Sequence, residues 1–538
     1  MSPPGGGSAY MGTLTRTVLL YCLVFVVHGA KDAPGYAASR PLLTTKYGQL
    51  QGKTNTVKGT DRAVHVFLGI PFAKPPIGEL RFAPPQPLDP WTSIRNASEH
   101  PPMCIQSRKL LNELKEFFMG EFPPPHLSED CLTLNIYTPA DRKPSDHLPV
   151  MVFIHGGALI LGGATMLDGS ALSAYENVVV VSLQYRLGIL GFLSTGTKEA
   201  TGNYGLLDQV AALQWVQENI KHFGGDPQSV TIFGESAGAA SVIAHVLSPS
   251  SKGLFHRAIA ESGTILMTGM LARSPEDLTT LLKAVSVMSL CKVKNLVECL
   301  KKKTVKGLLA TASVMSFNLG VLLGGMSREA AQLFLMALPD SVIPPAAIDL
   351  ILDEYLGNAT DPQEVRDRFL EMCADATIVI PALKTAIYYK AYGNPVYFYQ
   401  YQHRPYMFKD LKPTYVKADH GDELPIMMGS PFMTSADFFK GPATEKEETL
   451  SKTMMKYWAN FARTGNPNGP GLTAWPEHSE AESYLEINLE QKAAVGLAAN
   501  RLEFWTEILP EKMKHMFPEP VTWQMLRKRL EKLVHTEL

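Results

Sequence analysis

The stretch Ser229-Val230-Thr231-Ile232-Phe233-Gly234-Glu235-Ser236-Ala237-Gly238 decides how this chain is organised. Its first half is apolar and β-branched and small residues follow it, so the order predicts a strand, a sharp turn and a helix. Glycines stand on both sides of the serine because side chains there would collide with the strand and the helix. Such a turn exposes the hydroxyl at a helix N-terminus, where backbone N–H groups favour negative charge. We therefore predict that Ser236 is a nucleophile.

Other apolar runs on both sides of this stretch predict the fold. Continuous runs at residues 150–154, 178–183, 258–260 and 395–399 indicate buried strands, residues 206–223 show a helical pattern, and residues 47–52 suggest a short hairpin. Continuous apolar strands that alternate with helices are typical of a parallel sheet with helices on both faces. We expect an α/β fold with a large, mostly parallel central sheet, formed by one domain over residues 31–538.

A glycine pair follows the strand expected at residues 150–154. The segment His155-Gly156-Gly157-Ala158 matches the glycine-rich loop whose backbone N–H groups stabilise an oxyanion. The N–H groups of Gly157, Ala158 and Ala237 would form a three-donor oxyanion hole. The alternative is a simple turn after a strand.

The general base should follow the serine in the chain, because this architecture has the order serine, acid, histidine. The best candidate is His420, in the segment Ala418-Asp419-His420-Gly421-Asp422-Glu423-Leu424. It lies in a polar loop after the last expected strand, where loop residues reach an active site. An exposed loop histidine is the alternative interpretation.

The composition excludes several classes of partner. Among 538 residues, 45% are hydrophobic and 19% are charged, and the net charge is -2. A nearly neutral chain gives no reason to expect nucleic-acid binding. No cluster of Cys and His has the spacing of metal ligands, so we expect no metal and no cofactor.

Both ends of the chain carry targeting patterns. Arg16, a short apolar run and Gly29-Ala30 are typical of a signal peptide over residues 1–30, and no later run is long enough to cross a bilayer. The last residues, His535-Thr536-Glu537-Leu538, resemble a retrieval signal, which predicts a retrieval receptor as partner and the endoplasmic reticulum lumen as location. Sequons at Asn96 and Asn358 fit that compartment.

Cysteine spacing agrees with an oxidising compartment. The close pairs Cys104–Cys131 and Cys291–Cys299 are the expected disulfides. Cys373 is left over, and we expect it to be a buried core residue.

These motifs together resemble the type-B carboxylesterase family, most closely its mammalian carboxylesterase 2 subfamily. The resemblance rests on the segments around Ser236, His155, residues 128–135, His420 and residues 454–462, and on the terminal His-Thr-Glu-Leu, and it extends from about residue 43 to the end. It implies an α/β-hydrolase fold and serine esterase chemistry on carboxylic esters, thioesters and amides, including drugs and acylglycerols. The disulfides of the family fall on the same two cysteine pairs.

One segment departs from the family pattern. Relatives carry the triad acid as a Glu in a segment that resembles G-V-N-x-x-E-F-G, whereas this chain has Gly325 in that place if Gly320-Val321 is the matching pair. Several dozen residues are missing relative to such proteins, and the loss falls between about residues 309 and 326. Glu329 is the nearest substitute, although its position favours a first-turn helix carboxylate.

The sequence therefore leaves three functional interpretations. The first is a carboxylic ester hydrolase that forms an acyl-enzyme on Ser236 with His420 as base. The second is a catalytically impaired homologue, or a splice product without the acid, that acts as a binding protein. An adhesion protein of the cholinesterase-like type is disfavoured, because such proteins typically lack the serine.

Overall fold

The computed structural model describes residues 40–112, 126–143, 145–267, 269–271, 275–312, 325–338, 343–433 and 441–516. The expected signal peptide, the terminal His535-Thr536-Glu537-Leu538 and the Gly320-Val321 pair lie outside these residues. Among the helices described, none has the length and apolar character to cross a membrane.

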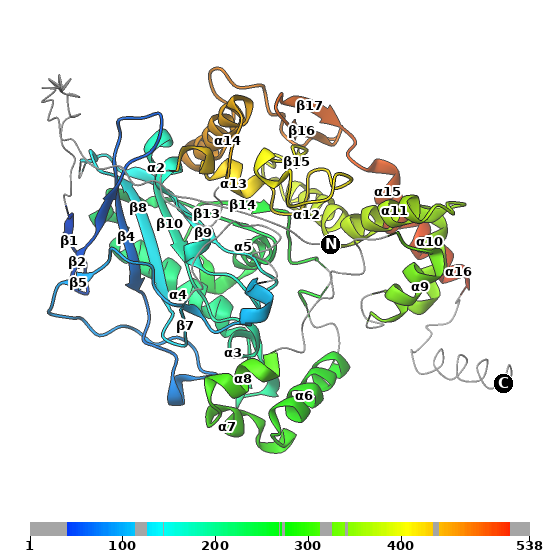
Figure 1. Cartoon of the computed structure of the whole chain (residues 1–538), viewed down its shortest axis with the longest axis horizontal. Coiled ribbons are helices and arrows are strands. Elements are labelled where there is room, and N and C mark those ends of the chain that lie inside the picture. Colours follow the sequence, from blue (N-terminus) through cyan, green and yellow to red (C-terminus); the bar gives the residue numbers. More distant parts are fainter. Residues whose placement is uncertain are drawn as a thin grey trace, which may run out of the picture. The chain divides into compact units, whose positions relative to one another are not determined.

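A seven-stranded sheet forms the centre of the fold (Figure 1). Its strands, in spatial order, are β14 (Arg257–Glu261), β13 (Gly225–Glu235), β9 (Leu148–Ile154), β10 (Val179–Leu183), β8 (Thr133–Pro139), β4 (Val64–Pro71) and β3 (Lys53–Asn55). The four strands from β14 to β10 are parallel to one another, whereas β8, β4 and β3 continue the sheet with antiparallel pairs. The sheet is therefore mixed, which corrects the expectation of a mostly parallel one.

Each face of this sheet packs against helices. On one face, side chains such as Val150, Val152 and Ile232 join a core with α4 (Tyr204–Asn219) and α5 (Ala237–Leu247). On the other face, Met151 and Phe153 pack with α2 (Ser170–Glu176), α13 (Glu423–Met427) and α14 (Glu445–Thr464). Burying apolar side chains on both faces is the main force that stabilises such a sheet.

Capping residues fix both ends of α14. The Thr444 hydroxyl accepts a hydrogen bond from the Glu447 N–H (3.3 Å), and the Glu447 carboxylate accepts one from the Thr444 N–H (2.8 Å). This reciprocal pair satisfies two N–H groups that a helix start leaves free. Gly465 ends the helix at φ 81°.

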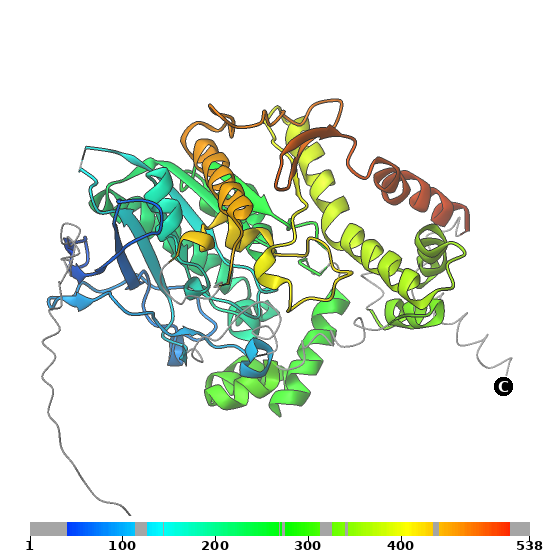
Figure 2. The same cartoon turned by 45° about the horizontal axis from the view of Figure 1, so that its top comes forward.

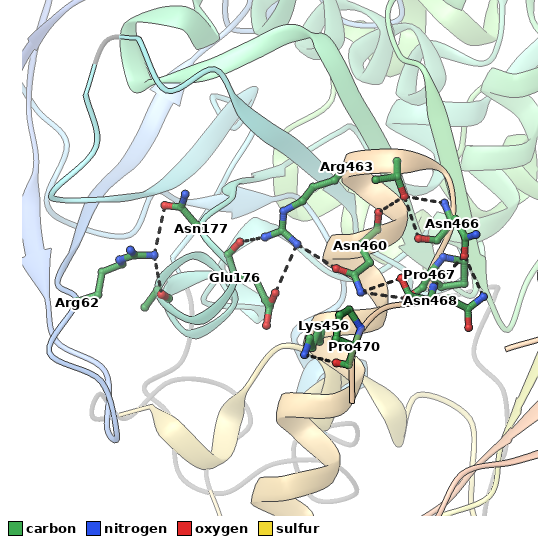
Figure 3. Close-up of polar contacts among 12 residues, drawn as sticks. Arg62, Glu176, Asn177, Lys456, Asn460, Arg463, Asn466, Pro467, Asn468 and Pro470 are labelled. Atoms are coloured by element: carbon green, nitrogen blue, oxygen red, sulfur yellow. Dashed lines mark hydrogen bonds and ion pairs between the residues drawn. The ribbon is translucent and has the colours of Figure 1, made fainter. Parts of the chain in front are cut away.

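Polar contacts at the last turn of α14 bind this helix to α2 (Figure 3). The Arg463 guanidinium donates to the Glu176 carbonyl, lies 3.6 Å from the Glu176 carboxylate and donates to Asn460 Oδ1 at 3.3 Å. Asn460 in turn donates to the Pro467 carbonyl at 3.2 Å. The helix and the loop after it are thereby fixed against the same face of the sheet.

A second group of helices forms its own core around Ile348, Ile351, Phe369 and Phe504. It contains α9 (Arg328–Met336), α10 (Pro345–Leu356) and α11 (Pro362–Ala374), with α16 (Leu509–Met516), and α15 (Ala499–Glu503) precedes the last helix. Figures 1 and 2 both show these helices side by side.

Among the described residues, the remaining α-helices range from five residues in α3 to 15 in α6. The other helices are α3 (Gly188–Phe192), α6 (Pro275–Ser289), α7 (Leu296–Lys301), α8 (Val305–Ala312) and α12 (Ile380–Ala391). Small sheets join β1 (Leu42–Thr44), β2 (Gln49–Gln51) and β5 (Arg95–Asn96); β15 (Tyr399–Tyr401), β16 (Ser483–Ile487) and β17 (Lys492–Val495); β6 (Met103–Cys104) and β7 (Leu127–Ser128); and β11 (Ser194–Thr197) and β12 (Ala200–Thr201).

Candidate functional site

Ser236 occupies a sharp turn between β13, which ends at Glu235, and α5, which begins at Ala237. Its backbone has φ 59° and ψ −122°, which is a strained conformation for a residue with a side chain. The Ser236 N–H donates to the Glu261 carbonyl at the end of β14 (2.9 Å), and the side chain is half-buried. The turn therefore holds the hydroxyl at the start of α5, as the sequence predicts.

The loop after β9 packs directly against this turn. A Cβ placed on Gly156 would lie 2.6 Å from Glu235 Oε2 and 3.1 Å from the Ser236 Cβ, so only glycine allows this approach. Gly157 and Ala158 continue the loop with φ of 97° and 54°. Among the described residues, no hydrogen bond uses the N–H of Gly157, Ala158 or Ala237. These are the three donors that the sequence suggests for an oxyanion hole.

His155 supports the loop. Its ring is buried and stacks on Tyr185 with 4.3 Å between ring centroids, and the Tyr185 hydroxyl donates to the His155 carbonyl at 2.8 Å. Burial lowers the pKa of His155 to about 4. The ring is therefore neutral at physiological pH and acts as part of the packing.

His420 lies in the loop between β15 and α13. A buried lysine holds this loop, since Lys412 Nζ lies 2.6 Å from Asp422 Oδ1 and 3.1 Å from Asp419 Oδ2. His420 Nε2 lies 2.9 Å from Glu235 Oε1. In the part of the chain that the structure describes, His420 Nδ1 is buried without a hydrogen-bond partner, and no hydrogen bond joins His420 to Ser236. The imidazole thus contacts the residue before the serine.

The carboxylates around His420 determine its charge. Burial alone favours the neutral ring, but the charge of Glu235 and its contact, with smaller effects of Glu423 and Asp419, outweigh it. Together these groups raise the pKa of His420 to about 9. The ring is therefore largely protonated at neutral pH in the free protein.

Glu235, Glu261 and Glu423 form a group of buried carboxyls that sequence reasoning did not assign to the site. Burial, and after it the charge of Glu423, raises the pKa of Glu261 well above its usual value, although Trp458 Nε1 donates to Glu261 at 2.7 Å. Burial and then the charge of Glu235 raise the pKa of Glu423 to about 8. The sequence marks these carboxyls only by their positions. Glu235 precedes Ser236, Glu261 follows the strand expected at 258–260, and Glu423 lies three residues after His420.

The two positions considered for the acid lie elsewhere. Glu329 is exposed in the first turn of α9, where its own backbone N–H and the Ser327 hydroxyl lower its pKa. A Cβ on Gly325 would meet Pro362 at the start of α11 (2.6 Å), and none of its nearest neighbours belongs to the His420 loop. Neither position contacts His420.

The structure contains the disulfides Cys104–Cys131 and Cys291–Cys299, as expected from the sequence. Cys373 is free and half-buried, and burial raises the pKa of its thiol to about 12. The sequon residues Asn96 and Asn358 are both exposed.

Comparison with known proteins supplies the family. A sequence model described as "Carboxylesterase family" matches residues 39–343 and 326–505, in two pieces that overlap over residues 326–343. The chain is 45% identical to the "Cocaine esterase" of Homo sapiens, over 90% of this chain and 94% of that protein. It is 43% identical to the "Acylcarnitine hydrolase" of Mus musculus (92% and 95% covered) and 43% identical to the "Fatty acyl-CoA hydrolase precursor, medium chain" of Anas platyrhynchos (94% and 98% covered).

These relatives span almost the whole chain, and their names are names of enzymes. They give no support to the interpretation as an impaired binding protein. The chain therefore belongs to the carboxylesterase family and is a serine hydrolase of carboxylic esters.

Proposed function

We propose that Ser236 is the nucleophile and His420 the general base of this hydrolase. The observation that carries the proposal is the strained Ser236 turn, packed against the glycine loop and placed one residue from the carboxylate that contacts His420. Strained backbone at such a turn persists only where the surrounding structure holds it, and it is common at active sites.

In the first half of the reaction, Ser236 Oγ attacks the ester carbonyl carbon while His420 accepts the hydroxyl proton. The carbonyl oxygen becomes an oxyanion, and the N–H groups of Gly157, Ala158 and Ala237 stabilise it. When the C–O bond of the ester breaks, His420 returns the proton to the leaving alkoxide, which departs as an alcohol.

In the second half, water replaces the alcohol. His420 accepts a proton from water as the water oxygen attacks the acyl-enzyme carbonyl, and the second oxyanion occupies the same hole. Collapse of this intermediate breaks the bond to Ser236 Oγ, which regains its proton from His420. The acid is released and the enzyme is restored.

The names of the relatives suggest the range of substrates. They include an esterase of a drug, an acylcarnitine hydrolase and a fatty acyl-CoA hydrolase. We therefore propose that this chain accepts carboxylic esters and acyl thioesters. Amides, acylglycerols and other xenobiotic esters, which the family resemblance implies, are further candidates.

We also propose that the protein works in the lumen of the secretory pathway. Two disulfides and two exposed sequons fit an oxidising compartment. The finer prediction, retention in the endoplasmic reticulum by a retrieval receptor, rests on the sequence of residues 535–538 alone.

Labelling and turnover test the catalytic assignment. We expect a fluorophosphonate probe to react with the wild-type protein and with no residue of the Ser236→Ala variant, because only an activated serine reacts readily. Stopped-flow hydrolysis of a p-nitrophenyl ester should show an acylation burst followed by steady turnover, and His420→Ala should slow both phases. Labelling that survives Ser236→Ala would contradict the assignment.

A further inference from the structure

We propose that Glu235 is the carboxylate partner of His420 in this chain, in place of the triad acid that its sequence lacks. The inference rests on the proposed roles of Ser236 and His420 and adds a positioning residue to them. It would make the shortened segment compatible with an active enzyme.

The contacts of the imidazole carry the inference. His420 Nε2 and Glu235 Oε1 form an ion pair at 2.9 Å, while His420 Nδ1 is buried and has no partner among the described residues. Although the two atoms are close, their geometry does not meet the angular requirement of a hydrogen bond. Catalytic hydrogen bonds in proteins without substrate are often poorly aligned and tighten when substrate binds.

The nucleophile lies in the same small space. Glu235 Oε2 and the Ser236 Cβ both lie against the same side of Gly156, at 2.6 and 3.1 Å from the position of a Cβ there. A Cβ on Gly421, the residue after His420, would lie 3.8 Å from Glu235 Oε1. The carboxylate is thus between the loop that carries the base and the turn that carries the serine.

The other charged groups near His420 leave this role to Glu235. Glu423 on α13 and Glu261 on β14 have raised pKa values and hold protons at neutral pH. Asp419, in the loop of His420 itself, pairs with Lys412, as does Asp422. Burial raises the pKa of Tyr399 and Tyr401 on β15, so both stay neutral.

The chemistry follows from the tautomer. A neutral ring that carries its proton on Nε2, facing Glu235, has its lone pair on Nδ1. Nδ1 then accepts the Ser236 proton as the bond from Oγ to the acyl carbon forms, and the resulting imidazolium is paired with Glu235. The same proton passes from Nδ1 to the alkoxide as the ester C–O bond breaks, so Glu235 keeps its charge throughout.

This arrangement predicts an alkaline pH profile. The base must be neutral to accept a proton, and the carboxylates raise the pKa of His420 to about 9. Activity should therefore increase with pH up to about 9. Removing the charge of Glu235 should move the profile towards the ordinary histidine pKa of about 6.5 and should remove the stabilisation of the imidazolium.

The experiment compares the pH dependence of kcat/KM and of fluorophosphonate labelling in the wild type and in Glu235→Gln. We expect the apparent pKa to fall by at least about one unit and the plateau at high pH to fall about 100-fold or more, since loss of a triad acid costs about 10⁴ in kcat. Glu235→Asp should recover part of the plateau.

Glu447→Gln is the matched control. Its carboxylate also lies buried beside a histidine, with Glu447 Oε1 2.9 Å from His403 Nε2, but it caps α14. Its removal should lower the unfolding temperature and leave the pH profile unchanged. Thermal unfolding of all variants separates a loss of folding from a loss of chemistry, and Glu235→Asp provides the test if Glu235→Gln does not fold.

Two results would overturn the inference. One is an unchanged profile in Glu235→Gln. The other is a higher activity of Glu235→Gln at neutral pH, which would mean that Glu235 competes with Ser236 for the ring. An unlabelled wild type, or labelling elsewhere than Ser236, would refute the proposed function instead.

Discussion

The strained conformation of Ser236 depends on its neighbours more than on the G-x-S-x-G pattern itself. The Ser236 N–H donates to Glu261 O, and its carbonyl accepts from the Ala240 N–H at 3.0 Å. Gly263, just beyond β14, packs so closely that a Cβ would lie 2.1 Å from the Ser236 carbonyl oxygen. The backbone after β14 therefore fixes the nucleophile from a side that the motif does not include.

Gly263→Ala tests this contact. The added Cβ would clash with a backbone oxygen, which cannot move aside as a flexible side chain can. We therefore expect the free energy of unfolding to fall by about 1 to 3 kcal/mol, as for other overpacking substitutions. Displacement of Ser236 should also slow fluorophosphonate labelling by about tenfold or more. Thermal unfolding and labelling rates measure the two effects.

Gly307→Ala is the control for that substitution. It lies on α8, and the nearest atom to an added Cβ is 3.6 Å away. Because alanine favours a helix over glycine by about 0.5 to 1 kcal/mol, this variant should be at least as stable as the wild type. Equal effects of the two substitutions would refute the contact argument.

At the residue scale, motifs predicted part of the candidate site and could not predict the rest. Ser236, His420 and the loop at Gly157 stand in patterns whose spacing reflects their chemistry. Glu261 and Glu423 show no such pattern, because their raised pKa values come from burial and from neighbouring carboxylates, Glu423 for Glu261 and Glu235 for Glu423. Those properties exist only once β14 and α13 have packed together.

At the scale of elements, the sequence predicted the parallel strands of the central sheet. β9, β10, β13 and β14 coincide closely with the expected apolar runs, and the helix expected over residues 206–223 begins two residues earlier, at Tyr204. β4 and β8 were not predicted. In β4 a histidine, a glycine and a terminal proline interrupt the apolar residues, and in β8 Asn135 and Pro139 do so, so neither is a continuous apolar run. β15 begins at Tyr399, where the expected strand over residues 395–399 ends.

A cavity of about 470 Å³ lies beside β14. β14 is one of the two edge strands of the seven-stranded sheet, and Ala258 and Ala260 line the cavity together with Tyr397 and Tyr399. Ala386 on α12 also lines it and is buried. The cavity is partly open to solvent and lined mainly by apolar groups, so part of its lining lacks the contacts that a filled core would have.

Filling this cavity should stabilise the protein. We expect Ala386→Leu to increase the free energy of unfolding by about 0.5 to 2 kcal/mol, the usual range for cavity-filling substitutions. Ala391→Leu, at an exposed position of the same helix, is the matched control and should change little. Denaturant unfolding of both variants checks this, and a destabilised Ala386→Leu would show that the cavity cannot accept a side chain from α12.

At the scale of the whole molecule, the disulfides and the sequons both bear on the cell compartment in which the chain folds. Cys104–Cys131 and Cys291–Cys299 lie in different parts of the fold, and the sequons lie on the three-stranded sheet with β5 and just after α10. All of these features agree with folding in an oxidising lumen. Glycosylation is the part that a direct measurement can resolve site by site.

We predict that Asn96 and Asn358 both carry glycans when the full chain is expressed in mammalian cells. Both side chains are exposed, and Asn96 Oδ1 accepts hydrogen bonds from the Ser98 N–H (3.1 Å) and hydroxyl (2.7 Å), which places the sequon in an exposed turn. Digestion with an N-glycosidase should increase the electrophoretic mobility of the wild type. Asn96→Gln and Asn358→Gln should each remove one glycan, and the double variant should be insensitive to the enzyme. Asn394→Gln, at an exposed asparagine outside any sequon, should behave as the wild type, whereas a wild type that does not shift would argue against passage through the lumen.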